Sequence, residues 1–547
     1  MPQRISRRSA LKGLAAISLL FVVPRNLLAA ALDAGSTLWR RVRPSDAAWP
    51  GKSEWQRLAD EVAGNLAEVH PLMESPDADK YLRNPFYLGD QPAGTEVSGW
   101  LGAWSPEPSA YAVRAQHTAD VVAAVNFARE HRLRLVVKGA GHSYQGTSNA
   151  PDSLLVWMRA MNRVTLHDAF VPRGCEGKLA PVPAVTAEAG AVWIDMYHAV
   201  TKVGGRYVQG GGCTDVGVAG LVQSGGFGSL SKGFGTAAAW LLEAEVVTAD
   251  GVARTVNACS EPELFWAIKG GGGGSWGVIT RVTLRTHDLP GKFGAAWGTI
   301  KATSDRAFRQ LIGRFLDFYS DKLFNPHWGE QVAFSPNNTL DLSMNCQGLT
   351  RDEAKGVWQP FFDWVASSPA DFYFVGEPGA GAWAARGWWD IKGNGAMVAD
   401  NRPGAPSYHG WWKGDGDQVG AFIYGYDSLW LPASLLDPAQ RPKLADALFA
   451  GSRHSKVGLH FNKGLAGAPA EAIAATRETA TNPAVCEAFA LALIADGGDV
   501  NGEDAIAAEV THLPDGLPPG CRGDRHVPAN LATTGASDSQ VSDSIDQ

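Results

Sequence analysis

Two reactive side chains stand inside glycine-rich stretches of this sequence. His142 lies in KGAGHSYQGTS, directly after the apolar run RLRLVVK, and Cys213 lies in GGGCTDVGVAGLVQSGGFG. An imidazole and a thiol are both nucleophiles that can form covalent bonds to electrophilic groups. Glycine lacks the Cβ that would keep a ligand away from the backbone, so both stretches predict close contact between the chain and a ligand.

The first stretch has the composition of an anion-binding loop. Successive backbone N–H groups in a tight turn bind phosphate oxygens, and hydroxyl side chains add further donors. The stretch matches neither the Rossmann G-x-G-x-x-G motif, which a helix follows directly, nor a P-loop, which ends in Gly-Lys-Ser/Thr. By itself it indicates either a nucleotide ligand or a structural glycine turn. The residues concerned are Gly139, Gly141, His142, Ser143, Gly146 and Ser148.

In this order and spacing, the two stretches resemble the FAD-binding domain of the vanillyl-alcohol oxidase and p-cresol methylhydroxylase (PCMH-type) superfamily. Within it they are most similar to the berberine-bridge-enzyme-like oxidases. The resemblance is strong from Glu107 to Pro290 and weaker to about Gly498. It implies that FAD is the cofactor and that further residues contact it, namely Cys213, Val216, Gly217, Val218, Gly220, Ser224, Gly225, Gly226, Gly228, Gly277 and Ile279.

The resemblance also implies covalent attachment of the flavin. In the family the histidine of the first loop bonds to the flavin 8α-methyl group, and in one branch a cysteine bonds to flavin position 6. His142 and Cys213 occupy those places. The alternatives are an ordinary loop histidine and a small, inert buried cysteine. Val216 occupies the position of a residue that faces the flavin in the family, where a valine accompanies access of molecular oxygen to the flavin. The alternative is that Val216 only packs in the core.

Hydride transfer from a carbinol to a flavin needs a base that takes the hydroxyl proton. The family's base position falls near His460, whose alternative is a hydrogen-bonded histidine of a sheet. Tyr424 and Tyr426 share a strand face and are second candidates, as tyrosinates of depressed pKa. Aromatic rings that could stack on a carbohydrate or an aromatic alcohol, or pack on one another, gather nearby: Trp383, Trp388, Trp389, Tyr408, Trp411, Trp412 and Trp430.

The order of predicted elements indicates an α+β fold. TADVVAAVNFARE predicts a helix that Thr118 caps, LLEAEVVTADG a strand and turn, and ELFWAIKGGGGGSWGVITRVTLR a helix, a glycine loop and a strand. We expect a PCMH-type FAD-binding domain of two α/β subdomains, and a substrate domain of antiparallel sheet covered by helices. The expected ranges are a signal at 1–31, an N-terminal part at 32–106, the FAD domain at 107–290, the substrate domain at 291–480 and an atypical segment at 481–547.

The N-terminus has the order of an export signal. Arg7 and Arg8 precede an apolar run that is too short to span a bilayer, and Ala29, Ala30 and Ala31 offer a cleavage site. The run resembles a twin-arginine signal, which implies export of the folded protein to the periplasm or the medium. The alternative is a membrane anchor.

The net charge and the cysteine spacing argue against a nucleic-acid-binding protein and against a metal site. Removing residues 1–31, which hold five basic residues and no acidic one, changes the net charge from −8 to −13. Such a charge argues against nucleic acid as a partner. The six cysteines show no CxxC spacing, so we expect no metal site, and their disulfide pairing is left open.

The end of the chain departs from the resemblance. After Phe489 no aromatic residue occurs in 58 positions, and the composition predicts disorder from about residue 499. Relatives carry an aromatic, basic segment there, and we therefore expect a truncated or frameshifted reading frame near Asp499.

The expected function is that of an exported oxidase, which passes a hydride from an alcohol or sugar carbinol to FAD and then electrons to molecular oxygen, giving H2O2. The alternatives are a dehydrogenase that reduces a quinone or cytochrome, and a flavin-binding protein with impaired catalysis.

Overall fold

The computed structural model describes residues 40–105 and 107–498. Contacts divide the chain into a unit Met1–Val42, of which only residues 40–42 are described, and a unit Arg43–Gln547, which holds every element below. The predictions for the export signal and for the segment beyond residue 498 therefore lie outside the described residues.

The first sheet has four strands in the order β1-β3-β5-β4. Strands β3, β5 and β4 run parallel, and β1 lies antiparallel at the edge. Strands that run parallel need a crossover connection, and helix α6 (Thr118–His131) makes one from β3 to β4, which lie on opposite sides of β5. The strands are β1 (Leu66–Glu68), β3 (Tyr111–Arg114), β4 (Arg134–Lys138) and β5 (Ser153–Trp157).

Helix α6 forms as its apolar pattern predicts, but its cap differs from the prediction. Thr118 is the first helical residue rather than the cap. The carboxylate of Asp120 instead accepts hydrogen bonds from the backbone N–H groups of Gln116 and His117, at 2.8 and 3.0 Å. An acidic side chain in the first turn also suits the positive end of the helix dipole.

The second sheet has five antiparallel strands in the order β10-β9-β11-β7-β6. Its strands include the two that the sequence predicts, one in LLEAEVVTADG and one after the glycine loop 270–274. The bounds are β6 (Val164–Phe170), β7 (Val182–Glu188), β9 (Leu241–Val247), β10 (Ala253–Asn257) and β11 (Val278–Arg285).

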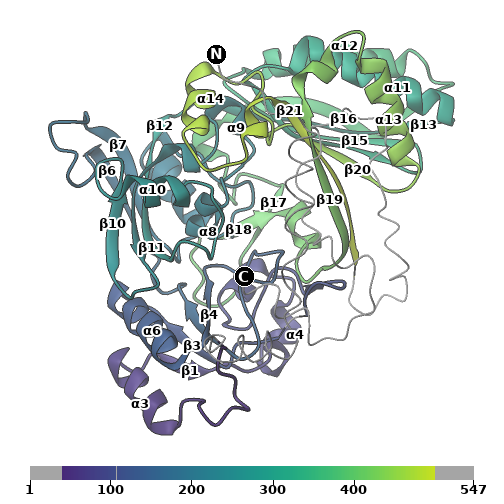
Figure 1. Ribbon diagram of the computed structural model, residues 1–547. Helices are drawn as coiled ribbons and strands as arrows, with labels where there is room; N and C mark the ends of the chain where they lie inside the picture. Colours follow the sequence, from purple (N-terminus) through teal and green to yellow (C-terminus); the bar gives the residue numbers. More distant parts are fainter. Residues whose placement is uncertain (1–39, 106, 499–547) are drawn as a thin grey trace, which may run out of the picture. The chain divides into compact units, whose positions relative to one another are not determined.

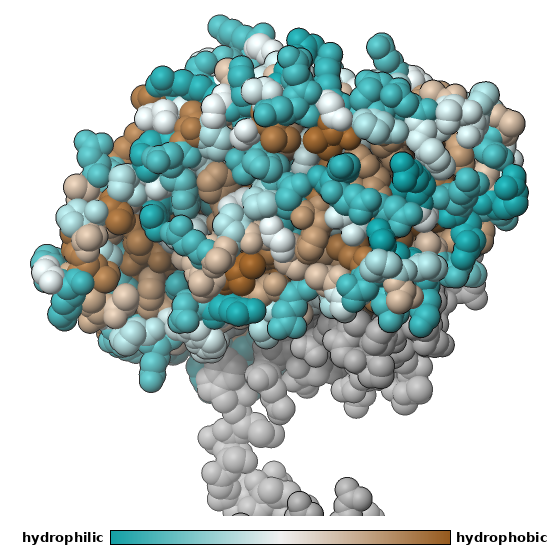
Figure 2. Space-filling model, turned by 90° about the horizontal axis from the view of Figure 1, so that it is seen from above, coloured by the Kyte–Doolittle hydropathy of each residue, from teal (hydrophilic) through white to brown (hydrophobic). Residues whose placement is uncertain are grey.

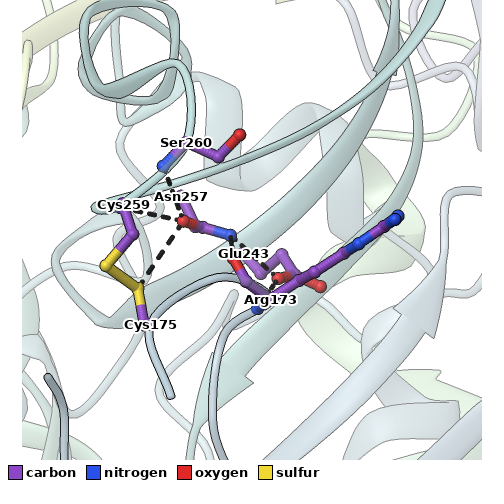
Figure 3. The surroundings of a disulfide bond; sticks show 6 residues. All are labelled: Arg173, Cys175, Glu243, Asn257, Cys259 and Ser260. Atoms are coloured by element: carbon purple, nitrogen blue, oxygen red, sulfur yellow. Dashed lines mark hydrogen bonds between the residues drawn. A yellow bond between two sulfur atoms is a disulfide. The ribbon is translucent and has the colours of Figure 1, made fainter. Parts of the chain in front are cut away.

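A disulfide between Cys175 and Cys259 ties two loops of this sheet together (Figure 3). The side chain of Asn257 lies beside it. Its Oδ1 accepts from the backbone N–H groups of Cys259 and Ser260, and its Nδ2 donates to the Glu243 carboxylate at 3.0 Å. The disulfide thus belongs to a fixed polar network at one edge of the sheet.

The third sheet is the predicted substrate sheet, with eight strands in the order β16-β13-β15-β14-β20-β21-β19-β2. All pairs are antiparallel except β19 with β2. The bounds are β2 (Gly99–Trp100), β13 (Lys292–Ala302), β14 (Trp328–Ser335), β15 (Thr339–Gln347), β16 (Phe372–Ala384), β19 (Phe422–Pro432), β20 (Val457–His460) and β21 (Ala488–Gly498).

Three helices cover one face of this sheet, α11 (Asp305–Phe318), α12 (Arg351–Ala366) and α13 (Arg441–Ser452), as Figure 1 shows. The core between them is rich in aromatic rings, among them the fully buried Phe315, Trp328 and Trp358. The other face of the sheet is free of these helices. Its side chains form one wall of the candidate site described below.

Strand β21 changes the predicted domain boundary. It lies between β20 and β19, pairs with both, and buries Phe489, Ala490 and Ala492 in the core under the helices. The substrate sheet therefore continues to Gly498 rather than ending near residue 480. Small apolar side chains suffice here because the strand is central and is covered on one face by helices.

Short elements complete the described chain. Two two-stranded sheets pair β8 (Arg206–Tyr207) with β12 (His287–Asp288) and β17 (Met397–Ala399) with β18 (Gly410–Trp412). A 3-10 turn, η6 (Lys413–Asp417), follows β18 directly. The remaining α-helices are α3 (Lys52–Glu61), α4 (Ala78–Tyr81), α5 (Pro85–Gly89), α7 (Trp193–Tyr197), α8 (Val218–Gln223), α9 (Ser231–Phe234), α10 (Pro262–Ile268) and α14 (Ala470–Arg477).

The surface seen in Figure 2 is mainly hydrophilic, with hydrophobic residues scattered among polar ones. Among residues 40–105 and 107–498, no helix has the length and apolar character that a membrane crossing requires.

Candidate active site

The structure brings the two glycine stretches into direct contact. The loop after β4 carries Gly139 and Ala140, and the loop before α8 carries Gly217. A Cβ on Gly217 would stand 3.2 Å from the backbone N of Ala140, and a Cβ on Gly139 would stand 3.9 Å from the Cα of Gly217. A side chain at position 217 would therefore crowd the Ala140 backbone, whereas one at position 139 would make only ordinary contact with Gly217. His142 and Cys213 are thereby held near one another.

His142 is bonded to a carboxylate. Its Nε2 donates to Asp215, and a second carboxylate oxygen, on Glu96, lies 3.8 Å from the same nitrogen. Both acids are almost wholly buried, with 3% and 5% of their side-chain surfaces exposed. The ligand atoms of the three residues lie within 4.8 Å of one another, a spacing that a metal site would also have. The position of His142 in the glycine loop favours a role as nucleophile instead.

The carboxylates determine the charge of this cluster. Burial alone would lower the pKa of His142, but Asp215 and Glu96 outweigh it and raise the pKa to about 9. Burial raises the pKa of Glu96 to about 7, and the positive charge of His142 partly offsets this. The flavin-free protein therefore carries a protonated His142 imidazole, bonded to Asp215, at neutral pH.

Cys213 is a free, half-buried thiol on the same cluster. Burial raises its pKa well above the usual value, and the acids around it, Asp415 first, raise it further. A side-chain hydrogen bond from the thiol lowers the pKa of Asp415, but burial and the charge of Asp215 outweigh it and raise that pKa to about 7. Asp415 interacts with His142 as well, so the two nucleophiles share one polar site.

The segment that carries Asp415 is fixed to both neighbours of Cys213. Thr214 donates its hydroxyl to the carbonyl of Gly410 at 2.7 Å, and Trp412 donates its indole N–H to the carbonyl of Gly212 at 3.1 Å. These bonds align β18 with the cysteine loop. The turn η6 follows at once and places Asp415 beside the thiol.

The other predicted cofactor residues lie in the loop after β4, in and beside α8, and at the start of β11. Ser143 bonds to Thr147, and Gly141 and Gly146 take positive φ angles of 90° and 72°. A Cβ on Gly228 would stand 1.8 Å from the carbonyl oxygen of Gly210, so the backbones touch there. Ser148 and Ile279 are buried, and Val216 is half-buried. Val218 and Gly220 lie in α8, Ser224, Gly225 and Gly226 directly follow it, and Gly277 precedes β11.

Of the three predicted bases, Tyr426 lies on the site. Its ring is 6.3 Å from that of Tyr144, whose pKa is raised by burial and by the charge of Cys213. Burial also raises the pKa of Tyr426, so the prediction of a tyrosinate with depressed pKa is wrong for this residue. Tyr424 lies on the same strand with its ring 6.0 Å from that of Phe422.

His460 ends strand β20 and pairs with Gln331 of β14. Burial, together with Lys463 and Lys456, lowers its pKa to about 3. The imidazole is therefore neutral at physiological pH, and the lowered pKa makes it a weak proton acceptor. It shares no recorded contact with His142 or Cys213 in the described part of the chain.

Glu330 is a further acid at this site that the sequence analysis did not identify. It lies on β14 with a φ of 66°, and a Cβ on Gly212 would stand 3.5 Å from its Oε1. Burial raises its pKa, while Ser229 and Lys463 favour the charged form. The pattern WGEQVAF gives no indication of this backbone conformation, because only the tertiary structure imposes it.

Most of the predicted stacking aromatics pack within the protein. Trp389 stacks on Tyr197 with ring centroids 3.9 Å apart, and Tyr408 stacks on His198 at 4.0 Å. Trp411 is buried in a cluster with Ala140 of the first glycine loop. Trp383 differs, because 44% of its surface is exposed. The alternative of aromatic self-packing therefore holds for Trp389, Tyr408 and Trp411.

The residues present fit an FAD. Two glycine loops offer close backbone approach, and their two nucleophiles lie at one polar cluster beneath the uncovered face of the substrate sheet. FAD, when bound, would supply a ring system that accepts a hydride and passes electrons onward.

Comparison with known proteins agrees with this fit. Residues 109–257 match the family model described as an FAD binding domain. The FAD-linked oxidoreductase malF of Malbranchea aurantiaca is 34% identical over 282 residues, which cover 46% of this chain and 48% of malF. The VAO-type flavoprotein oxidase VAO615 of Thermothelomyces thermophilus is 30% identical over 373 residues, covering 60% of this chain and 61% of that oxidase. The chain thus spans about half to three-fifths of these relatives.

Solved structures extend the likeness to the fold. The crystal structure of MtVAO615 from Myceliophthora thermophila C1 superposes with a TM-score of 0.66 and 24% identity, covering 86% of this chain and 84% of that one. Glucooligosaccharide oxidase from Acremonium strictum superposes with a TM-score of 0.55 and 18% identity, covering 80% and 81%. That oxidase carries a 6-S-cysteinyl, 8α-N1-histidyl FAD. The predicted α+β fold of the PCMH type is confirmed.

Proposed function

Since this chain has an FAD-binding domain and the fold of the VAO/PCMH-type flavoproteins, we propose that it is an FAD-linked oxidase with a bicovalent flavin. His142 bonds to the 8α-methyl group and Cys213 to position 6 of the ring. One observation carries the proposal: two nucleophiles from separate glycine loops lie at a single buried cluster, joined through Asp215 and Asp415. A structural role for either residue would not require the other to be there.

The substrate proposed is an alcohol or sugar carbinol. Its C–H gives a hydride to FAD, its O–H gives a proton to a protein group, and molecular oxygen takes the electrons and leaves as H2O2. Among described residues, Glu330 and His460 are the groups proposed to accept the proton. Glu330 lies at the cysteine loop, whereas the lowered pKa of His460 makes that imidazole the weaker base in the flavin-free protein.

Export as a folded protein is part of the proposal. It is supported by the order of basic, apolar and small residues at the N-terminus. The disulfide between Cys175 and Cys259 is also typical of an oxidising compartment. Fractionation of cells that express the chain tests this, with Arg7→Lys and Arg8→Lys together expected to retain the protein inside the cell.

The enzymatic part is tested with purified protein under anaerobic conditions. D-glucose, cellobiose and vanillyl alcohol serve as probes, and loss of the flavin absorbance reports reduction. Admission of air should restore the absorbance with formation of H2O2. Reduction without peroxide in air would indicate a dehydrogenase, and no reduction by any probe would contradict the proposed substrate class.

A further inference from the structure

We propose that each nucleophile has its own carboxylate for covalent flavin attachment, Asp215 for His142 and Asp415 for Cys213. The two acids are positioning residues, because they act through the imidazole and the thiol. The inference rests on the proposed function, since it concerns the bonds that would hold FAD.

The bond between His142 and Asp215 selects one imidazole nitrogen. The imidazole, whose pKa is raised, donates its Nε2–H to Asp215. At neutral pH Nδ1 holds a proton as well, and once that proton is lost to solvent the free lone pair of the neutral ring lies on Nδ1. Nδ1 has no recorded hydrogen-bond partner among the described residues. The geometry therefore assigns Nδ1 as the attacking nitrogen, while Asp215 stabilises the positive charge that develops as it attacks.

Cys213 needs a proton acceptor, because a thiol must lose its proton before it attacks. Its surroundings oppose a free thiolate, since it is buried among Asp415, Asp215 and Glu96. A local acceptor is needed, and Asp415 is the acid whose charge acts most strongly on the thiol. Its Oδ2 is buried and has no hydrogen-bond partner in the described part of the chain, so it remains available.

Hydrogen bonds fix the position of the segment that carries Asp415 relative to Cys213. Backbone carbonyls and side chains join β18 to the residues on both sides of the thiol, through Thr214 with Gly410 and Trp412 with Gly212. The chain then runs only three residues from Trp412 to Asp415. These two hydrogen bonds, one on each side of Cys213, hold the segment that carries Asp415 against the cysteine loop.

The chemistry balances with molecular oxygen as the oxidant. At Cys213 the thiol proton passes to Asp415, sulfur bonds to ring carbon 6, and the hydrogen of that carbon leaves as a proton. At His142, Nδ1 bonds to the 8α carbon, the methyl group loses one proton, and the Nε2 proton passes to Asp215. Each bond releases two protons and two electrons, which convert one O2 to one H2O2.

The test follows the two bonds separately by mass spectrometry of peptides from purified protein incubated with FAD in air. Asp415→Asn should slow formation of the Cys213 bond about a hundredfold and leave the His142 bond, whereas Asp215→Asn should do the reverse. Asp415→Glu should restore much of the rate. Asp400→Asn is the matched control, a buried acid of the same segment that pairs with Arg402 at 2.8 Å.

Selective loss of one bond in each variant supports the proposal. Unchanged rates, or equal loss of both bonds in both variants, would overturn it. If an asparagine variant fails to fold, the rate in the corresponding glutamate variant decides the matter, since a shifted carboxylate should slow only its own bond. A wild-type protein without any covalent flavin would refute the bicovalent function itself, which is a separate failure.

Discussion

The imidazole of His142 is bonded to the carboxylate of Asp215, which stands two residues after Cys213 in the chain. One short segment therefore supplies one nucleophile and holds the other.

Replacing Gly228 by alanine should disrupt the contact between the two parts of the second glycine loop. The new Cβ would stand 1.8 Å from the carbonyl oxygen of Gly210, closer than any atoms can pack. We expect lower stability by several kcal/mol or loss of soluble protein, on the scale of the largest single-site effects. Gly220→Ala is the control, because its Cβ meets nothing within 4 Å and alanine favours a helix by roughly 0.5–1 kcal/mol. Thermal unfolding of both flavin-free variants measures the difference, and equal stability would refute the packing argument.

Removing the disulfide should destabilise the protein without altering the site. Cys175→Ser with Cys259→Ser opens a link that spans 84 residues of sequence. Loss of a native disulfide typically costs about 2–5 kcal/mol. Denaturant unfolding of this double variant should show a lower midpoint, and adding a reductant should then have no further effect. A wild-type protein whose midpoint ignores the reductant would argue against the bond.

The stability of the flavin-free protein should depend on the charge of His142. Its pKa rises from 6.5 to about 9 on folding, because of Asp215 and Glu96. The stabilisation is complete below pH 6.5 and is lost as the pH rises through about 9. The unfolding free energy of the wild type relative to His142→Ala, measured from pH 6 to pH 10, should therefore fall as the pH rises. The same slope in both proteins would contradict the assignment.

The proton acceptor of the proposed oxidation can be identified by comparing two conservative variants. Glu330→Gln and His460→Gln each remove one candidate base. The variant that lacks the true base should reduce its flavin about a hundredfold to ten-thousandfold more slowly with an active carbinol probe. The other variant should stay near the wild-type rate. Wild-type rates in both variants would contradict the assignment of the base to Glu330 or His460. Tyr426→Phe would then test the remaining candidate.

The sequence was sufficient for the fold class and for the two glycine stretches because these depend on local patterns. Strand and helix periodicity and the motif around Cys213 are both local signals. Asp215 could have been identified as a candidate as well, since it lies inside the motif around Cys213. Its bond to His142 could not be predicted, because it joins loops 73 residues apart in the sequence.

Other parts of the site depend on contacts that no local pattern records. Glu96 and Asp415 come from distant loops, and the backbone of Glu330 is set by its place in β14. The aromatic residues near Trp411 suggested a surface that stacks on a sugar, but the Trp411 ring is buried in a cluster with Ala140. Strand β21 was missed because small apolar residues give a weak strand signal unless neighbours on both sides are known.

The central claim is tested most directly by the mass of the purified, fully denatured wild-type protein, compared with His142→Ala, Cys213→Ala and the double variant. The account predicts that the wild type and both single variants each retain one FAD through denaturation, and that only the double variant releases it. Release of all flavin from the wild type, or retention by the double variant, would contradict the account.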